Sequence, residues 1–451
     1  MKKFLYGYLL ACMAQCFITD AVAQSSSPAV LDYAKVDDFH EGFALVRKGE
    51  NYSIIDRNGK QLVPLGLYDL GSGSAFLPES GFRDGRCLVK DAATGLYGFI
   101  DTSGWLVVPC QFEQAYAFKN GYASGHTMDE KRKYEYYFVD PKGQCYNTPS
   151  SAMQQRENVF IIKDNVTFPL KDYYRKNGTK AFTSENIIWE YAEGLYKTSL
   201  RSAGNEGKYG YIDTTGKMVI PMRINTRAEL GVFSEGLLSY RPQFQDEYHL
   251  AYLDRQGNEV FRIPADAGIT RVSMWRDFRY GYADCEVNTA ERSNIRSVID
   301  HQGNIIVIED LFRKMNPGFE RDRSDVFRTR YNFTYSGRDQ SGIRFTIDIA
   351  LKPGSETARM LGIGTGSATG GVGGGQRFIE VKAMGMMDYT GRLIIPPVFY
   401  QLAGHDPDSG LAKAVYVSSS RETVQGFVGN GPGFVFRMKT NDDSFFTNSL
   451  N

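Results

Sequence analysis

Two stretches of the sequence decide the fold: "YGFIDTSGWLVVP" from Tyr97 to Pro109 and "YGYIDTTGKMVIP" from Tyr209 to Pro221. In each, an aromatic and apolar run is followed by Asp, two variable residues and Gly, and then by a second apolar run that ends in Pro. The shared Asp and Thr are either the residues of a duplicated catalytic site or those of a duplicated turn. Looser copies of the pattern distinguish the two.

Five looser copies begin at Tyr52, Tyr136, Ala251, Ser297 and Met384, so the pattern occurs seven times. Successive copies are separated by about 40 to 46 residues or by about twice that distance, as expected of a tandem repeat with gaps. Two degenerate copies fit the long gaps, one around Asn177 and one near Ser336 to Gly342. The turn residues of the clear copies are Asp56, Asp101, Asp140, Asp213, Asp254, Asp300 and Asp388.

The D-x-x-G element has the chemistry of a turn. Asp suits the first position of a type I turn, and Gly suits the position after the central pair, where φ is positive. With a glycine bulge this is a common β-hairpin loop. The two central residues differ in every copy, and Pro141 is one of them, which fits a turn and not a reaction. We therefore interpret Asp101 and Asp213 as turn residues, and Thr102 and Thr214 as free positions.

A second signature, an aromatic residue, two polar residues and Gly before an apolar run, lies between the hairpins. Together the two signatures give at least three strands per unit, and the high content of Gly (47), Tyr (28) and Phe (29) suits short strands joined by tight turns. The sequence predicts an all-β fold of tandem antiparallel β-meander repeats. The glycines of the second signature are Gly42, Gly85, Gly121, Gly194, Gly236 and Gly281.

The combined pattern resembles the WG repeat of many bacterial proteins, with Tyr97-Gly98, Tyr209-Gly210 and Met384-Gly385 in the place of the family's Trp-Gly. The match covers roughly residues 39 to 312 and 384 to 397. The family's Trp is absent from every copy, residues 153 to 182 match weakly, and residues 350 to 376 have no repeat features. The resemblance implies a β-rich repeat fold and a binding or interaction role with no known catalytic residues.

The architecture has two alternatives. A unit of about 42 residues is the size of one propeller blade, and about eight or nine units could close a ring. The same units could stack as an open β-solenoid. Because the chain begins with half a unit, Phe39 to Val46, which a C-terminal strand such as Gly426 to Val428 could complete, we slightly favour a propeller-like ring.

The N-terminus has the pattern of a secretory signal peptide. Lys2 and Lys3 form its basic end, an apolar stretch follows, and Ala21-Val22-Ala23 is a cleavage site. Cys12 could instead bear a lipid anchor, but the apolar run before it is short, so we favour a soluble exported product that is periplasmic, at the cell surface or extracellular. No later stretch is apolar enough to form a transmembrane segment.

This gives four expected segments: a signal peptide (1–23), a WG-like β-repeat region (24–349), a Gly-rich insertion loop (350–376), and a C-terminal repeat with closing strands (377–451). The loop contains "GIGTGSATGGVGGG" from Gly362 to Gly375. It has neither the Lys of a Walker A motif nor a following helix, so we interpret it as a flexible insertion and not as a phosphate site.

Charge and cysteine content narrow the class of protein. The 52 basic and 52 acidic residues balance, so no nucleic-acid partner is expected, because phosphate binding needs a basic face. After removal of the leader four cysteines remain, with no C-x-x-C pair; we expect buried thiols or one disulfide, and the sequence does not choose among the pairings. They are Cys87, Cys110, Cys145 and Cys285.

No motif for catalysis, cofactor binding or metal binding is found. The five histidines form no H-E-x-x-H or other ligand cluster, and G-x-S-x-G is absent. Asp406 and Asp408 in "HDPDSG" are two residues apart, as in calcium loops, but the remaining ligands are missing, so a turn is the better interpretation. The acidic pairs at 129–130 and 246–247 are interpreted as solvated loop charges. The histidines are His40, His126, His249, His301 and His405.

Aromatic residues remain as the best binding candidates. Most should pack in the core, but two clusters are candidates for outward-facing surfaces that bind a sugar or a protein. We therefore expect a non-catalytic module that binds an unidentified protein or glycan in the bacterial envelope. The alternative is a carbohydrate-active hydrolase with a site in divergent loops of a propeller. The two clusters are Tyr134, Tyr136 and Tyr137, and Tyr331, Phe333 and Tyr335.

Overall fold

The computed structural model of the chain describes residues 28–70, 81–149, 160–163, 171–199, 207–225, 228–241, 250–263, 268–275, 277–317, 332–351, 379–417, 423–431 and 433–440. The expected signal peptide and the glycine-rich segment lie outside these residues. The chain divides into two compact units, Ser72–Ile308 and a second unit made of Met1–Gly71 with Glu309–Asn451. Among the described residues, no helix is long and apolar enough to span a membrane.

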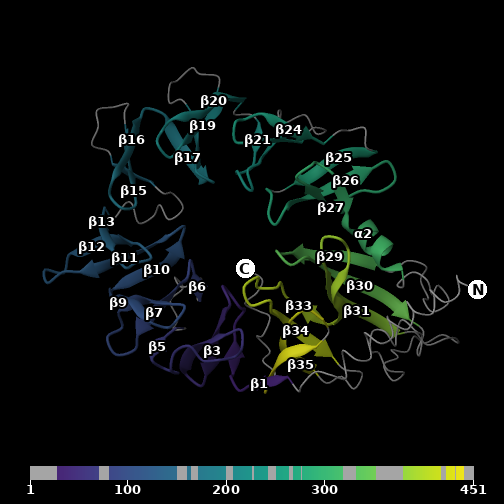
Figure 1. The fold of residues 1–451 in the computed structure, drawn as a ribbon, viewed down its shortest axis with the longest axis horizontal. Helices are drawn as coiled ribbons and strands as arrows, with labels where there is room; N and C mark the ends of the chain where they lie inside the picture. Colours follow the sequence, from purple (N-terminus) through teal and green to yellow (C-terminus); the bar gives the residue numbers. More distant parts are fainter. Residues whose placement is uncertain are drawn as a thin grey trace, which may run out of the picture. The chain divides into compact units, whose positions relative to one another are not determined.

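The unit Ser72–Ile308 is a succession of small antiparallel sheets, which follow one another in chain order (Figure 1). Its strands are β6 (Phe82–Arg83), β7 (Arg86–Asp91), β8 (Tyr97–Asp101), β9 (Leu106–Phe112), β10 (Gln114–Lys119), β11 (Tyr122–Met128), β12 (Tyr134–Val139), β13 (Cys145–Thr148), β14 (Phe160–Lys163), β15 (Lys171–Arg175), β16 (Lys180–Ser184), β17 (Ile187–Ala192), β18 (Leu195–Ser199), β19 (Lys208–Asp213), β20 (Met218–Asn225), β21 (Glu229–Leu230), β22 (Leu238–Arg241), β23 (Ala251–Leu253), β24 (Glu259–Arg262), β25 (Ile269–Trp275), β26 (Tyr282–Thr289), β27 (Ile295–Asp300) and β28 (Ile305–Val307).

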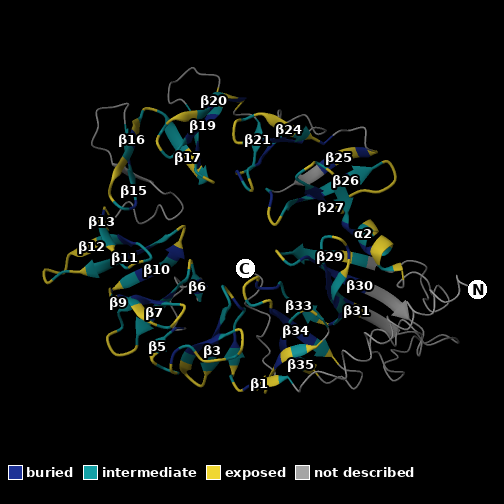
Figure 2. Ribbon diagram, viewed as in Figure 1, coloured by how far each residue is buried: buried dark blue, intermediate teal, exposed yellow. Residues whose placement is uncertain are grey.

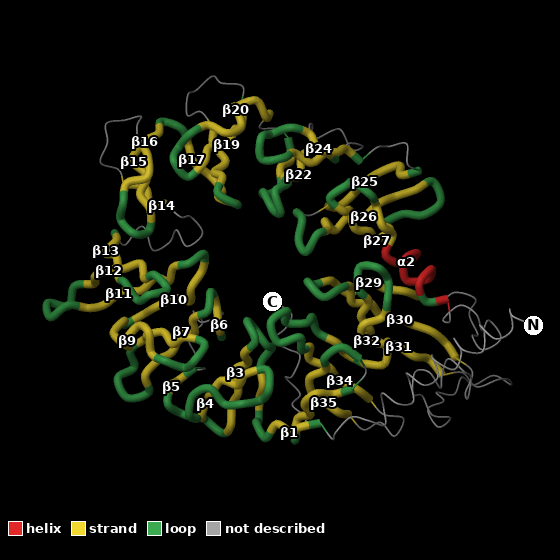
Figure 3. Tube along the Cα trace, viewed as in Figure 1, coloured by secondary structure: helices red, strands yellow, loops and turns green. Residues whose placement is uncertain are grey.

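The other unit contains sheets from both ends of the chain, and α2 is the one helix among the described residues (Figure 3). Three sheets have the orders β2-β3-β4, β29-β30-β31-β32 and β1-β36-β35-β34-β33. The elements are β1 (Ala29–Leu31), β2 (Lys35–Val36), β3 (Phe43–Lys48), β4 (Asn51–Asp56), β5 (Tyr68–Asp69), α2 (Ile308–Met315), β29 (Asn332–Arg338), β30 (Ile343–Leu351), β31 (Ile379–Met387), β32 (Leu393–Phe399), β33 (Gln401–Leu402), β34 (Ala412–Val417), β35 (Thr423–Val428) and β36 (Phe434–Met438).

The all-β fold of tandem antiparallel meanders is thus confirmed. The degenerate copy around Asn177 is the hairpin between β15 and β16. The stretch from Ser336 to Gly342 is not a second D-x-x-G hairpin, because it forms the turn between β29 and β30, in the same sheet as Asp388.

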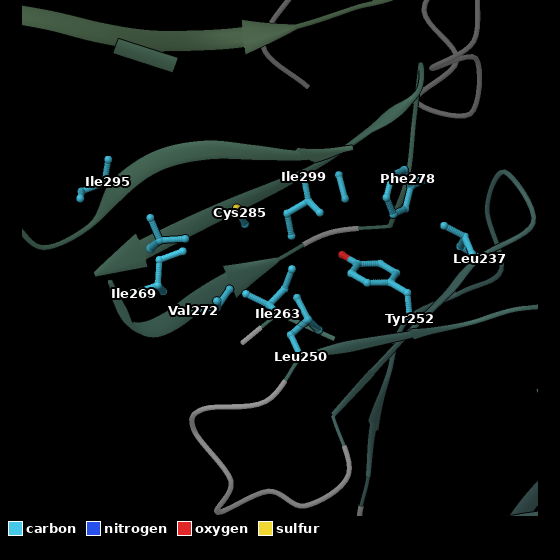
Figure 4. Packing of buried hydrophobic residues seen from close by; sticks show 12 residues of the cluster. Leu237, Leu250, Tyr252, Ile263, Ile269, Val272, Phe278, Cys285, Ile295 and Ile299 are labelled. Carbon is cyan, nitrogen blue, oxygen red and sulfur yellow. The ribbon is translucent and has the colours of Figure 1, made fainter. Parts of the chain in front are cut away.

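Some inner strands are buried on both faces. Phe99 and Ile100 are neighbours on β8, so their side chains point to opposite faces, and both are fully buried. Figure 2 shows buried residues concentrated on such strands and exposed residues in the connections. Figure 4 shows one of the cores between sheets, where Leu250 and Tyr252 of one sheet meet Phe278 and Cys285 of the next.

The first and last sheets pack against each other in the unit Met1–Gly71 with Glu309–Asn451. Phe39 contacts Phe427 edge-on with ring centroids 5.1 Å apart, and β1 pairs in parallel with β36, with Leu31 opposite Met438. The expected pairing of Phe39 to Val46 with Gly426 to Val428 is wrong in detail, since β3 pairs only with β2 and β4. The short strand β1, which precedes the predicted half unit, completes the last sheet instead.

The glycine of the Y-G pair is required by a close approach of backbone. A Cβ atom on Gly98 would lie 2.5 Å from the Val108 carbonyl oxygen, and on Gly210 it would lie 2.7 Å from that of Ile220. At both sites the register with the edge strand shifts, which indicates a β-bulge. Pro109 on that edge strand offers no N–H to a further strand, so the repeat protects its own edge.

Candidate functional site

The D-x-x-G residues are turn residues, as predicted. Asp101 Oδ1 accepts hydrogen bonds from the backbone N–H groups of Ser103 (2.9 Å) and Trp105 (3.0 Å), and Gly104 has a φ of 86°. The same two bonds recur in the other six copies. The carboxylates that repeat most clearly are therefore committed to backbone N–H groups and are not available for catalysis.

The pKa values of the carboxyl groups agree with this. A hydrogen bond from the Ser103 hydroxyl holds the pKa of Asp101 below its usual value, and Thr215 does the same for Asp213. Every described Asp or Glu whose pKa departs clearly from the ordinary value is lowered. A glycosidase acid needs a raised pKa, which is the opposite of the shift at these eight carboxyl groups.

The second signature has a role that its sequence did not reveal. Its third residue, just before the Gly, has positive φ, and at Asp84, Glu193 and Glu235 the carboxylate crosses to the next sheet. Glu235 Oε2 accepts the Gly281 N–H at 2.9 Å, and Glu193 Oε2 accepts the Gly236 N–H at 2.9 Å. We call this contact the carboxylate latch. The residue that donates the N–H is Gly, because its φ is positive and Gly adopts such a conformation without strain.

The same latch joins the last sheet to the first. Asp406 Oδ2 accepts the Gly42 N–H at 3.1 Å and the Ser409 N–H at 2.7 Å. "HDPDSG" is therefore a turn, as preferred over a calcium loop, and among the described residues no group of His, Cys, Asp and Glu is arranged to hold a metal ion. Sequence reasoning missed this contact because its partners lie at opposite ends of the chain.

The other sequence candidates are dispersed. Cys87, Cys110, Cys145 and Cys285 are free thiols, and burial raises the pKa of Cys87 and of Cys285 to about 12, so both are unreactive near neutral pH. Asp129 is the acceptor of a hairpin turn, with its Oδ1 atom 2.7 Å from the Lys133 nitrogen.

The histidines do not cluster. His301 occupies a hairpin turn, and its ring contacts that of Phe278 in a tilted arrangement with centroids 4.4 Å apart. His126 lies on a strand and His405 is buried. His249, with the acidic pair at 246–247, lies outside the described residues. In the part of the chain that the structure describes, no histidine belongs to a group of three or more potential metal ligands.

One of the two aromatic clusters forms a surface. Tyr134 and Tyr136 are on one face of β12, with ring centroids 6.4 Å apart, and the His126 ring of β11 lies 4.8 Å and 5.6 Å from them. Tyr134 is 49% exposed, and the neighbouring Met128 is also exposed. We call these four residues the aromatic surface. It lies beside the β11–β12 hairpin, whose tip is exposed in Figure 2.

The remaining aromatic candidates are not part of it. Tyr137 is on the opposite face of β12, where its ring packs against Phe112. Phe333 stacks on Phe345 with centroids 5.3 Å apart and contacts Phe312, so it belongs to the core of its sheet. Tyr331 lies outside the described residues.

The aromatic surface lies toward the end of its sheet at which the repeat copies differ from one another. In an antiparallel meander the first and third connections lie at one end of the sheet and the second at the other. In the sheet β10 to β13 the two signature turns at Gly121 and Asp140 share one end, and the β11–β12 connection is at the opposite end. The end with the two signature turns recurs in the copies. The opposite end, where the copies differ, carries the aromatic side chains.

Comparisons with known proteins agree with the repeat. The family model for the WG containing repeat matches residues 28–52, 97–124 and 209–241. No curated protein matches the chain.

Solved structures give only distant similarities. One is described as a eukaryotic initiation factor, at 9% identity over 87% of this chain and 94% of the other, with a TM-score of 0.38. Another is a protein of unknown function from Bacteroides caccae, at 11% identity over 57% and 89%, with a TM-score of 0.18. A third, from work on two prolyl endopeptidases, has 12% identity over 75% and 58%, and a TM-score of 0.25. At such TM-scores these similarities bear no argument about function.

The matched segments have a clear place in the fold. Residues 97–124 run from β8 through β9 into β10 and β11, and residues 209–241 run from β19 to β22. These two matches thus take the outer hairpin of one sheet and the inner strands of the next. The Y-G glycine of each, Gly98 or Gly210, lies at a bulge. The chain is therefore similar to the WG containing repeat at three segments.

Proposed function

We propose that this protein is an exported, non-catalytic WG-repeat protein of the bacterial envelope. It binds another protein or a glycan through the ends of its sheets at which the repeat copies differ. The observation that carries the proposal is the aromatic surface on β11 and β12. Exposed aromatic groups in a cluster are typical of binding surfaces, because they supply large contact area at a small entropic cost. The leader-like residues 1–23 support the export.

The chemistry of the surface suits recognition. Burial lowers the pKa of His126, and the neighbouring Glu113 carboxylate raises it, with burial the larger effect. The ring is therefore neutral at pH 7, so it has one hydrogen-bond donor and one acceptor. Two tyrosine hydroxyl groups lie beside it. Such a surface offers flat apolar area together with neutral polar groups, which suits a sugar ring or a polar peptide.

A direct test uses the mature protein with Tyr134→Ala and Tyr136→Ala together, screened on a glycan array and in pulldowns from envelope extract. We expect the wild-type protein to retain a glycan or a protein partner, and the double variant to lose at least tenfold of that binding. Trp105→Ala is the matched control, because Trp105 is a more exposed aromatic residue (75%) that is not part of the cluster. A wild-type protein without any partner in both assays, or a double variant that binds normally, would contradict the proposal.

A further inference from the structure

A partly buried arginine and a buried histidine lie close together in the unit Met1–Gly71 with Glu309–Asn451. Arg344 is the second residue of β30, and His405 follows β33 in the neighbouring sheet. Their side chains are close enough that Arg344 lowers the pKa of His405 electrostatically. Two glycines leave room for the guanidinium: a Cβ atom would lie 2.9 Å from it on Gly337 and 3.7 Å on Gly404.

Neither side chain has its hydrogen bonds satisfied. His405 is only 5% exposed, and neither its Nδ1 nor its Nε2 atom forms a hydrogen bond of normal geometry, although the nearby Gly429 carbonyl raises the pKa of the imidazole. The Nε atom of Arg344 is buried without a partner as well. Among the described residues, no acceptor or carboxylate is within hydrogen-bond or ion-pair distance of the Arg344 guanidinium. A buried unpaired charge is costly, so this arrangement is unusual in a finished core.

The nearest carboxylate is already used. Asp339 lies in the turn between β29 and β30. Its Oδ2 atom accepts the backbone N–H of His405 at 2.9 Å, and its Oδ1 atom accepts the backbone N–H of Ser341 at 2.8 Å. The Tyr389 hydroxyl donates to the Asp339 carbonyl at 2.6 Å and fixes the turn. Asp339 raises the pKa of Arg344 from a distance but forms no ion pair with it. Asp339 thus lies near the guanidinium, but its two carboxylate oxygens accept backbone N–H groups.

We propose that Arg344 and His405 form a binding site for an oxyanion, a carboxylate or phosphate group carried by a small ligand. A guanidinium presents its N–H groups as a planar fork that matches these anions, and a neutral imidazole adds one donor. A water molecule could satisfy the nitrogen atoms but would not compensate the charge. Arg344 is only partly buried, whereas its Nε atom and the two imidazole nitrogens are buried.

The site is tested by anion-dependent thermal stabilisation and titration calorimetry on the mature protein. The probes are inorganic phosphate and acetate at constant ionic strength, with chloride as the reference, because phosphate also stabilises proteins non-specifically. We expect saturable binding of at least one probe, and the arm that binds shows whether phosphate or carboxylate is preferred. Absence of saturable binding of either probe overturns the proposal.

The variants are Arg344→Met and, as matched control, Arg296→Met, which removes an arginine already paired with Glu286 at 2.8 Å. Arg344→Met should lower anion affinity more than tenfold, and in chloride alone it should unfold no earlier than the wild-type protein, because an uncompensated charge is gone. Arg296→Met should bind normally. If Arg344→Met binds normally, or unfolds much earlier in chloride, Arg344 has a structural role and the site does not exist. The aromatic surface is untouched by these variants, so failure here leaves the proposed function to its own test.

Discussion

The joint between the last and first sheets and the joint between the sheets β21–β24 and β25–β28 are built alike, although only the second is made by chain neighbours. In the terminal joint Phe39 meets Phe427 edge-on at 5.1 Å, and in the inner joint Phe278 meets Tyr252 edge-on at 5.1 Å. The latch is present in both. The terminal joint thus uses the contacts of an ordinary repeat interface.

The two joints differ at one polar pair. In the inner joint Asp277 accepts a hydrogen bond from the Ser239 hydroxyl at 3.0 Å. At the corresponding positions of the terminal joint, Asp38 and Lys413 form an ion pair at 3.1 Å, with Lys413 almost fully buried. The terminal joint also has the parallel pairing of β1 with β36. The two sheets of the terminal joint are far apart in sequence, so bringing them together costs more loop-closure entropy than in the inner joint. The added contacts offset part of that cost.

The largest expected effect comes from the aromatic contacts. Phe39→Ala and Phe278→Ala each remove a buried ring and should lower the free energy of unfolding by about 3 to 5 kcal/mol. Urea denaturation followed by intrinsic fluorescence measures both. If Phe39→Ala costs less than about 1 kcal/mol while Phe278→Ala costs the full amount, the two joints are not equivalent.

The ion pair is expected to have the next largest effect. Lys413→Met leaves Asp38 partly buried without its partner, and because Asp38 remains partly exposed we expect a loss of about 1 to 3 kcal/mol. The double variant with Asp38→Asn should recover part of that loss, since no charge is left unpaired. A double-mutant cycle gives the coupling, and a coupling near zero would show that the ion pair does not stabilise the joint.

The latch should contribute less, about 1 kcal/mol for each hydrogen bond. Glu235→Ala and Asp406→Ala remove the acceptor, whereas Glu235→Gln keeps an oxygen at the same position and should be close to the wild-type protein. The measurement is again the urea midpoint. If Glu235→Gln is as unstable as Glu235→Ala, the latch depends on charge and not on the hydrogen bond.

The smallest effect at neutral pH is that of His405, and it grows in acid. Burial lowers the pKa of His405; Asp339 raises it, the Gly429 carbonyl raises it without a hydrogen bond of normal geometry, and Arg344 lowers it. Because the folded pKa is below the unfolded value of about 6.5, the unfolded chain binds more protons, so stability falls as the pH drops below about 6.5. His405→Phe places the aromatic residue of the other copies there and should flatten the dependence between pH 7 and 5. An unchanged slope would contradict this.

Local chemistry explains what the sequence could predict. The hairpin at Asp101 to Gly104 is specified by residues within one turn, so the strands and their antiparallel pairing followed from seven imperfect copies. The latch between Asp406 and Gly42 could not be predicted in the same way, because it depends on how one sheet faces another. The same holds for Arg344 and His405, which belong to different sheets. Tyr134 was identified as a binding candidate, but only the strand register showed that Tyr137 points to the other face.

The offset between the matched segments and the sheets has a consequence for how such a chain grows. A duplicated stretch equivalent to residues 97–124 would bring half of one sheet and half of the next, together with the contacts between them. An added copy would already contain the residues that pack between two neighbouring sheets. It would only have to form hydrogen bonds that complete the two half-sheets. Genes built from this unit can therefore lengthen or shorten without first evolving a new complementary surface.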